Sequence, residues 1–256
     1  MSLPSFSLEG KVSLITGARR GIGAAFAVAF AEAGSDVVIC DIVVDDGLIA
    51  GVAKEIEKFG RRALVVKTDV TREDDVENLV KKAVDEFGRI DILVNNAGIA
   101  PLNKTLDVTV EEWDRVIDID MKSVFLMSKA VGKVMIKQKK GKIINMGSIY
   151  GQMATAFSIH YCAAKAGIAQ MTKALALDWA RFNINVNCIV AGQIATELTR
   201  RQQDEEAQRK FLEFKIPLKR FGQPEELVGP ALLLASQASD YMTGSIVVVD
   251  GGYSIW

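Results

Sequence analysis

Short, almost continuously apolar runs alternate along the chain with longer stretches in which apolar positions recur at helical spacing. Continuous apolar runs of strand length are typical of strands that are covered on both faces of a sheet. The predicted strands are residues 12–16, 37–40, 63–66, 90–95, 143–146, 184–190 and 245–250. The predicted helices are residues 22–33, 47–59, 72–87, 111–137, 158–180, 204–214 and 225–236.

This alternation predicts a single α/β domain over residues 1–256. Parallel strands need crossover connections, and the predicted helices supply them. The expected architecture is therefore a Rossmann-like, doubly wound, parallel seven-stranded sheet with helices on both faces. Residues 193–215, which follow the sixth strand, are expected to form a substrate loop.

Composition narrows the class of partner. The 256 residues are 49% hydrophobic and 25% charged, which is typical of a globular protein. With 31 Lys and Arg against 32 Asp and Glu, the net charge of -1 offers no field to hold a nucleic acid. The longest apolar run, residues 21–31, is shorter than the about 20 residues that cross a bilayer, and the first residues lack signal-peptide features. We expect a cytoplasmic protein with no membrane partner.

No metal site is expected. Cys40, Cys162 and Cys188 are too widely spaced to suggest a disulfide framework or a zinc site. His160, the only histidine, has no second ligand nearby in sequence and is interpreted as a packing or pocket-rim residue. The basic run at residues 137–142 is interpreted as complementing the dipole of a helix C-terminus.

A glycine-rich turn, T-G-A-R-R-G-I-G at residues 16–23, connects the first strand to the first helix. Glycine allows the sharp turn and the close approach of backbone to a pyrophosphate, and the helix N-terminus supplies free N–H groups. Such a turn can also be purely structural, but the strand–turn–helix–strand setting favours a dinucleotide site. The predicted contacts here are Gly17, Arg19, Arg20, Gly21, Ile22 and Gly23.

Asp41 ends the second strand, where a carboxylate can bind both ribose hydroxyls of an adenosine, although it could also be an ordinary loop aspartate. A 2'-phosphate about 4 Å from this carboxylate would be repelled by about 4 kcal/mol at an effective dielectric near 20. NAD is therefore favoured as the cofactor. NADP stays open, because Arg19 or Arg20 could bind a 2'-phosphate or pair with Asp41.

The candidate chemistry lies further along the chain. Ser148 follows the fifth strand, and Tyr161 and Lys165 stand four residues apart on one face of a predicted helix. An ammonium beside a phenol is expected to lower its pKa from about 10, which would let it exchange a proton with a secondary alcohol. Isolated Tyr-x-x-x-Lys pairs are often surface contacts, but Ser148 lies at the strand end where open α/β sheets bind ligands.

Taken together, these motifs resemble those of the short-chain dehydrogenase/reductase family, over essentially the whole chain. The ordered matches are the glycine turn, T-D-V at 68–70, N-N-A-G at 95–98, Ser148, the Tyr161/Lys165 pair and D-G-G at 250–252. The resemblance implies that Tyr161 is the general acid/base, that Ser148 binds the substrate oxygen and that Lys165 binds the nicotinamide ribose. The further cofactor contacts that it implies are Asp69, Val70, Asn95, Ala97, Gly98, Ile194 and Thr196.

Two positions depart from the family pattern. Asp120 stands where the family usually has an asparagine that helps to position a water between the lysine and solvent. An ionised aspartate keeps an acceptor, loses the amide donor and raises the pKa of a nearby lysine. We therefore treat Asp120 as a candidate catalytic residue that shifts the pH profile. At residues 190–192 the chain has Val-Ala-Gly where the family commonly has Pro-Gly, so we expect a looser turn.

The sequence predicts an oxidoreductase that transfers a hydride between a nicotinamide cofactor and a secondary alcohol or ketone, such as a sugar acid, a polyol or a small ketone. The family resemblance also implies a homotetramer. Two alternatives remain open: an NADPH-dependent 3-oxoacyl-carrier-protein reductase, and a nicotinamide-binding scaffold without catalysis. The expected substrate wall comprises Ile149, Tyr150, Gln152, Met153, Phe157, Gln193, Leu198 and Phe211.

Overall fold

The computed structural model describes residues 5–255 and is built around one parallel sheet. The strands are β1 (Val12–Thr16), β2 (Asp36–Asp41), β3 (Ala63–Lys67), β4 (Ile92–Asn95), β5 (Gly141–Ser148), β6 (Ile184–Ala191) and β7 (Ile246–Val249). Their order is β3-β2-β1-β4-β5-β6-β7, so the chain winds outward in both directions from the β1–β4 pair. The predicted doubly wound, seven-stranded fold is confirmed.

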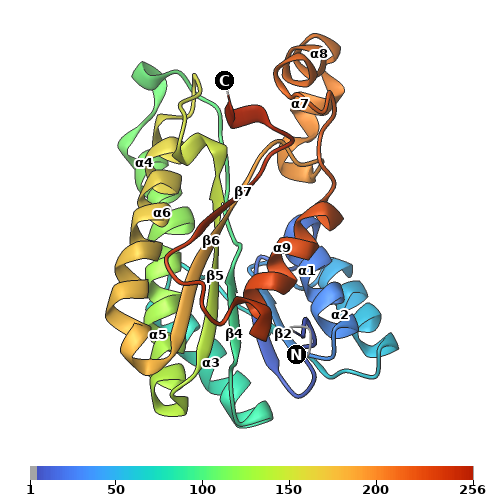
Figure 1. Cartoon of the computed structure of the whole chain (residues 1–256). Helices are drawn as coiled ribbons and strands as arrows, with labels where there is room; N and C mark the ends of the chain where they lie inside the picture. Colours follow the sequence, from blue (N-terminus) through green and yellow to red (C-terminus); the bar gives the residue numbers. More distant parts are fainter. Residues whose placement is uncertain (1–4, 256) are drawn as a thin grey trace.

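Helices cover both faces of the sheet (Figure 1). One face carries α1 (Gly21–Glu32), α2 (Leu48–Lys58) and α9 (Val228–Ala235). The other carries α3 (Glu73–Phe87), α5 (Ser123–Gln138) and α6 (Ile159–Trp179). Each layer buries its own apolar cluster against the strands, and this two-sided burial explains why the strand sequences are almost continuously apolar.

The predicted helix at residues 111–137 is interrupted. The structure has α4 (Val110–Val116), then a π-helical segment (Ile117–Lys122), then α5. A π-helical turn contains more residues than an α-helical turn, and such turns are frequent at functional sites. This one carries Asp120, whose side chain is completely buried.

The C-terminal helices also differ in detail from the prediction. The helix predicted at residues 204–214 is α8 (Glu206–Lys215), and a separate short helix, α7 (Arg200–Asp204), precedes it. The last predicted helix begins as a 3-10 turn (Pro224–Leu227) before α9. The other predicted elements agree with the structure to within a few residues at their ends.

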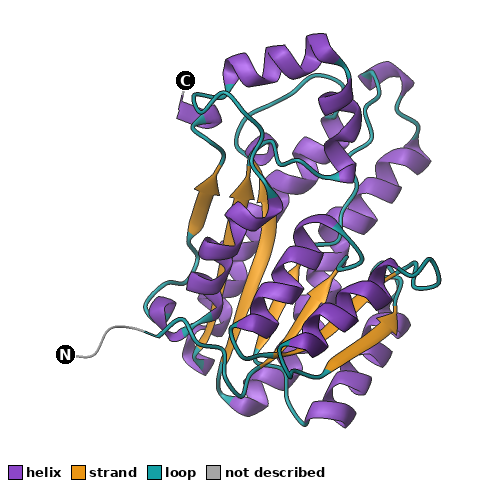
Figure 2. Ribbon diagram, turned by 90° about the vertical axis from the view of Figure 1, so that its right-hand side faces the viewer, coloured by secondary structure: helices purple, strands orange, loops and turns teal. Residues whose placement is uncertain are grey.

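The strand arrows all point toward the end of the sheet over which α7 and α8 lie (Figures 1 and 2). In open α/β sheets, ligands bind outside these carboxyl ends. Across residues 5–255, no helix combines the length and apolar character needed to span a membrane. The same residues contain no group of three or more His, Cys, Asp or Glu side chains arranged to hold a metal ion.

Candidate active site

A cavity of about 1450 Å³ opens at the carboxyl ends of the strands. It is lined by the glycine turn, the ends of β2 and β5, the first turns of α6, and the segment that carries α7 and α8. The predicted site residues that line it are Gly17, Arg19, Arg20, Gly21, Ile22, Asp41, Asp69, Val70, Ala97, Gly98, Asp120, Ser148, Tyr161, Lys165, Ile194 and Thr196. Two predicted cofactor contacts, Gly23 and Asn95, do not line it.

The glycine turn offers bare backbone to the cavity. Gly17 and Gly21 have φ angles of 64° and 59°, in the left-handed region that favours glycine. The N-cap Arg20 makes no side-chain bond to the start of α1, so no side chain there competes for the N–H groups at that helix end. Free N–H groups beside a closely approachable backbone fit the pyrophosphate of a dinucleotide.

Gly23 has a different role from the one expected. A Cβ at this position would lie 2.4 Å from the carbonyl oxygen of Gly17 and 2.6 Å from Nδ2 of Asn96. Gly23 therefore allows α1 to pack directly behind the glycine turn. The structure thus gives Gly23 a packing role and does not place it in the cavity lining.

Asn95 and Asn96 point in different directions because successive side chains alternate across a strand. Asn95 is buried and donates to Oδ1 of Asn145 at 2.8 Å and to Oγ of Ser128 at 3.2 Å. It joins β4 to β5 and α5 and does not line the cavity, so the structure places it behind the site where it was expected to contact the cofactor. Asn96 lines the cavity and donates to the carbonyl oxygens of Thr16 and Gly17 at 2.9 and 3.0 Å. The sequence analysis did not single out Asn96 as a site residue, although the Asn95-Asn96 doublet in N-N-A-G could have indicated it.

Arg19 lies between two carboxylates at the end of β2. Its Nε is 3.7 Å from Oδ1 of Asp41, and its Nη1 pairs with Asp46. The sequence left open whether Arg19 binds a 2'-phosphate or pairs with Asp41, and in the structure it pairs with Asp41. Asp46, which sequence reasoning missed, lies in the loop before α2. Desolvation raises the pKa of its carboxyl, but the Leu48 N–H and Arg19 together outweigh this effect, so the pKa lies below its usual value.

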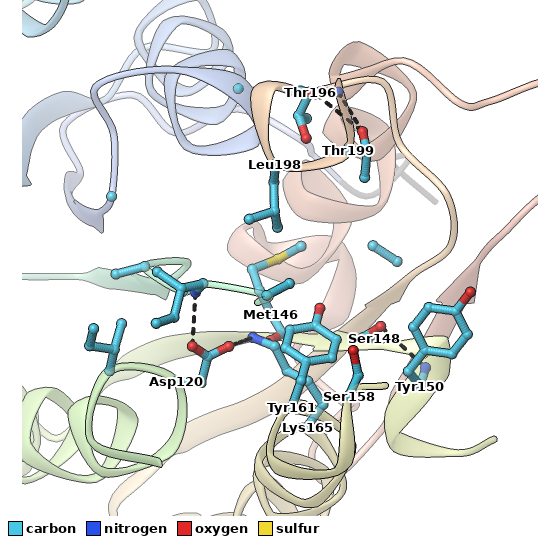
Figure 3. Close-up of a pocket in the computed structure, with 18 of the residues that line it drawn as sticks. Asp120, Met146, Ser148, Tyr150, Ser158, Tyr161, Lys165, Thr196, Leu198 and Thr199 are labelled. Carbon is cyan, nitrogen blue, oxygen red and sulfur yellow. Dashed lines mark hydrogen bonds and ion pairs between the residues drawn. The ribbon is translucent and has the colours of Figure 1, made fainter. Parts of the chain in front are cut away.

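Ser148, Tyr161 and Lys165 meet at the centre of the cavity (Figure 3). Ser148 is the last residue of β5, and its Oγ accepts the N–H of Tyr150 at 3.2 Å. The Ser148 hydroxyl also acts to lower the pKa of the Tyr161 phenol. Lys165 extends beneath the phenol, with its Nζ 5.5 Å from the ring centroid and 3.2 Å from the carbonyl oxygen of Met146. The expected juxtaposition of these three side chains is therefore present.

Asp120 contacts Lys165 directly. Its Oδ2 lies 3.1 Å from the lysine Nζ, and its Oδ1 accepts the N–H of Ile99 at 2.8 Å (Figure 3). Both side chains are buried and form part of the cavity floor. The π-helical turn thus places a carboxylate against the ammonium that the sequence associates with Tyr161.

The pKa of Tyr161 is raised, which differs from the expected lowering. Burial is the main cause; Lys165 lowers the pKa as predicted, but Asp120 raises it again. Burial lowers the pKa of Lys165, yet Asp120 and Tyr161 outweigh it and the net shift is upward, in the direction predicted from Asp120. Burial raises the pKa of Asp120 itself, with Lys165 opposing. The three groups therefore form one coupled, buried system.

The expected substrate wall is present in part. Tyr150, Phe157, Gln193, Leu198 and Phe211 line the cavity. Ile149, Gln152 and Met153 do not line it, and Ile149 packs in the core instead. Nε2 of Gln193 donates to the Tyr150 hydroxyl at 2.8 Å, so the wall contains hydrogen-bonding groups as well as the apolar side chains of Phe157, Leu198 and Phe211.

Comparison with known proteins identifies the family of the chain. Residues 17–254 match the family model described as enoyl-(acyl carrier protein) reductase. The chain is 40% identical over 254 residues to 2-dehydro-3-deoxy-D-gluconate 5-dehydrogenase of Escherichia coli K12, with 99% of each chain covered. The chain belongs to the short-chain dehydrogenase/reductase family. The present protein is therefore an NAD(P)-dependent oxidoreductase.

Two further relatives show the range of the family around this dehydrogenase. A 3-oxoacyl-[acyl-carrier-protein] reductase of Synechocystis sp. PCC 6803 is 42% identical over 247 residues, with 96% of this chain and 98% of that protein covered. A gluconate 5-dehydrogenase from Burkholderia cenocepacia, solved with NADP and tartrate, has a TM-score of 0.93, 35% identity and 98% coverage of both chains. The sugar-acid and acyl branches are thus both represented among similar proteins.

Proposed function

We propose that this dehydrogenase uses NAD to interconvert a secondary alcohol and a ketone on a small polyhydroxylated acid or polyol. The observation that carries the proposal is the convergence of Ser148, Tyr161 and Lys165 in a cavity that also contains the glycine turn. This arrangement sets a proton-exchanging phenol beside a site that fits a dinucleotide.

Each side chain has a distinct proposed role. The Tyr161 phenol exchanges a proton with the substrate oxygen, and the Ser148 hydroxyl holds that oxygen by a hydrogen bond. Lys165 stabilises the phenolate and binds the nicotinamide ribose, while Asp120 fixes the lysine and sets the pH at which the phenol titrates. The bound nicotinamide supplies or accepts the hydride. The glycine turn, Asp69, Val70 and the segment from Ile194 to Thr196 are the proposed cofactor contacts.

The substrate class is supported by the cavity wall. Tyr150, Gln193 and Ser158 bring hydroxyl and amide groups to the cavity. Such groups suit the several hydroxyls of a sugar acid or polyol, because each buried polar group of a ligand needs a partner. Similarity to dehydrogenases of gluconate derivatives favours the same class.

The preference for NAD is argued from charge. Asp41 ends β2 beside the glycine turn, and Arg19 is already paired with Asp41 and Asp46. Because these two carboxylates already hold Arg19, and Asp41 itself borders the cavity, a 2'-phosphate would be repelled by Asp41 and would have Arg20, which also lines the cavity, as its partner at this end. The same argument weakens the alternative of an NADPH-dependent acyl-carrier-protein reductase. The cavity lining also includes more carboxylates than basic side chains, whereas docking of a carrier protein was expected to need a basic patch.

A homotetramer in the cytoplasm is proposed for the assembly and location. Phe125 on α5 and Leu177 on α6 expose 48% and 83% of their surface, so both helices present apolar side chains outward. Light scattering of the purified protein tests the assembly, and a monomeric mass would overturn it.

The deciding experiment assays sugar acids, polyols, diketones and acyl thioesters with NAD(H) and NADP(H), using the wild type and Tyr161→Phe. We expect turnover of a polyhydroxylated substrate with NAD and a loss of about 10²- to 10⁴-fold in kcat in the variant, with NADH affinity unchanged. Preferential use of an acyl thioester with NADPH would replace the proposed substrate class. Cofactor binding without turnover of any compound would favour the non-catalytic scaffold.

A further inference from the structure

His160, the single histidine, is the second residue of α6 and directly precedes Tyr161. Its side chain is completely buried, and its Nδ1 accepts the backbone N–H of Tyr161 at 2.8 Å. The first N–H groups of a helix have no partner within the helix. The N-cap residue Ser158 does not cap α6; its hydroxyl lies 3.4 Å from the carbonyl oxygen of Pro101. His160 therefore caps the peptide of the residue that we propose exchanges the proton.

The other ring nitrogen fixes the histidine to a second helix. Because Nδ1 accepts a hydrogen bond, a neutral ring carries its proton on Nε2. Nε2 lies 3.0 Å from Oε1 of Glu112, in the first turn of α4. The hydrogen bonds from His160 and Asn103 hold the pKa of the Glu112 carboxyl below its usual value, so it is a charged acceptor.

The same carboxylate reaches the rim of the cavity. Both Glu112 oxygens accept from Nδ2 of Asn103, at 2.9 and 2.7 Å. The N–H of Asn103 donates to the carbonyl oxygen of Phe157 at 2.8 Å, and Phe157 and Leu102 both line the cavity. A continuous set of hydrogen bonds thus joins two rim segments to the backbone of Tyr161.

We propose that His160 is a positioning residue for Tyr161, and that Asn103, Glu112 and His160 act as one strut that fixes the first turn of α6 relative to the cavity rim. The inference rests on the proposed role of Tyr161 in proton exchange. A displacement of about 1 Å at a reacting group can cost about a hundredfold in rate, so a fixed first turn matters for turnover more than for binding.

Two substitutions at His160 separate capping from mere bulk. His160→Ala removes the acceptor for the Tyr161 N–H and the bond to Glu112. His160→Asn places Oδ1 near the position of Nδ1, so it keeps the cap and loses only the bond to Glu112. We expect kcat to fall by about tenfold in His160→Ala and to recover most of this loss in His160→Asn. The substrate KM and the NADH dissociation constant are expected to change by less than about twofold in both variants, because neither contact reaches the cofactor.

Glu112→Ala tests the second half of the strut, with Asp107→Asn as its matched control. Asp107 is an exposed carboxylate a few residues earlier that does not line the cavity. We expect a several-fold loss of kcat in Glu112→Ala and no change in Asp107→Asn. Equal effects in the two variants would attribute the loss to charge alone and overturn the strut.

Hydrogen–deuterium exchange supplies a readout that needs no substrate. The amides at residues 159–164 are expected to exchange faster in His160→Ala than in the wild type, and at the wild-type rate in His160→Asn. Exchange that is identical in all three proteins would overturn the cap even if no compound in the substrate panel is turned over. Faster exchange with an unchanged kcat would reduce His160 to a structural cap and overturn its positioning role.

Discussion

The two ends of the cavity differ in whether backbone or side chains form the functional surface. At the cofactor end the surface is backbone: Gly17 and Gly21 adopt positive φ, and Gly23 lets α1 pack against the turn. At the chemical end the surface is side chain, where Tyr161, Lys165 and Asp120 form a buried, coupled set of ionisable groups.

This difference explains where the sequence can vary. A backbone surface depends on the absence of side chains, so any added atom meets its neighbours. A side-chain cluster depends on charge balance, so one residue can be exchanged and its effect appears as a shifted pKa. The glycine turn keeps the family spacing, whereas the family's usual asparagine is replaced by Asp120 at the chemical end.

The largest effect is expected from breaking the backbone surface with Gly23→Ala. The new Cβ would lie 2.4 Å from a backbone oxygen, and relief requires α1 and the turn to separate. Overpacking of this kind costs about 1–3 kcal/mol, and we expect NADH binding to weaken by about tenfold or more, with a lower Tm.

Isothermal titration with NADH and thermal unfolding measure both effects. The control is Gly51→Ala in α2, where an added Cβ meets nothing within 4 Å. Because alanine is preferred over glycine inside a helix, Gly51→Ala is expected to stabilise the protein by about 0.5–1 kcal/mol without changing NADH affinity. Equal losses of NADH affinity and Tm in both variants would contradict the packing role of Gly23.

A smaller and qualitatively different effect is expected from Asp120→Asn at the chemical end. The Asp120 carboxylate raises the pKa of Tyr161 and of Lys165, so its removal lowers both. Alcohol oxidation needs the phenolate, which then forms at lower pH. The rise of kcat/KM with pH is therefore expected to move toward acid, so the variant should oxidise the alcohol faster than the wild type on the acidic limb of the profile.

Initial rates of alcohol oxidation across pH 5–10 check this shift, and Asp118→Asn provides the control. Asp118 lies on the same π-helical segment but pairs with Lys122 near the surface. A pH profile that is identical in Asp120→Asn and the wild type would show that Asp120 has no special role.

The fold was predictable because its determinants are local. Two-sided burial leaves continuous apolar runs, and the glycine turn stands directly between a strand and a helix. The Ser148, Tyr161 and Lys165 cluster was predictable for a related reason: a strand end and a single helix turn place the three groups without any long-range information.

The features that were missed depend on contacts between distant segments. The π-helical turn that buries Asp120 leaves no periodicity signal that distinguishes it from a continuous helix. The basic run at 137–142 was interpreted as a helix-end charge cluster, but Lys142 is buried in β5 and pairs with Asp240 at 2.8 Å. The partner of His160, Glu112, lies 48 residues away in the chain. Single-sequence reasoning has no access to such pairings.

The smallest effect is expected at the cofactor end, where the Arg19 ion pairs border the backbone surface of the glycine turn. Asp46→Asn removes one carboxylate partner of Arg19, leaving Asp41 at 3.7 Å. An ion pair at an exposed carboxylate contributes little, so the ratio of kcat/KM for NADP over NAD is expected to rise only a few-fold, with tighter NADPH binding in a fluorescence titration. Asp45→Asn removes the same charge from an exposed neighbour and is the matched control. If both variants shift the ratio equally, the general negative field sets cofactor choice; if only Asp46→Asn does, the orientation of Arg19 sets it.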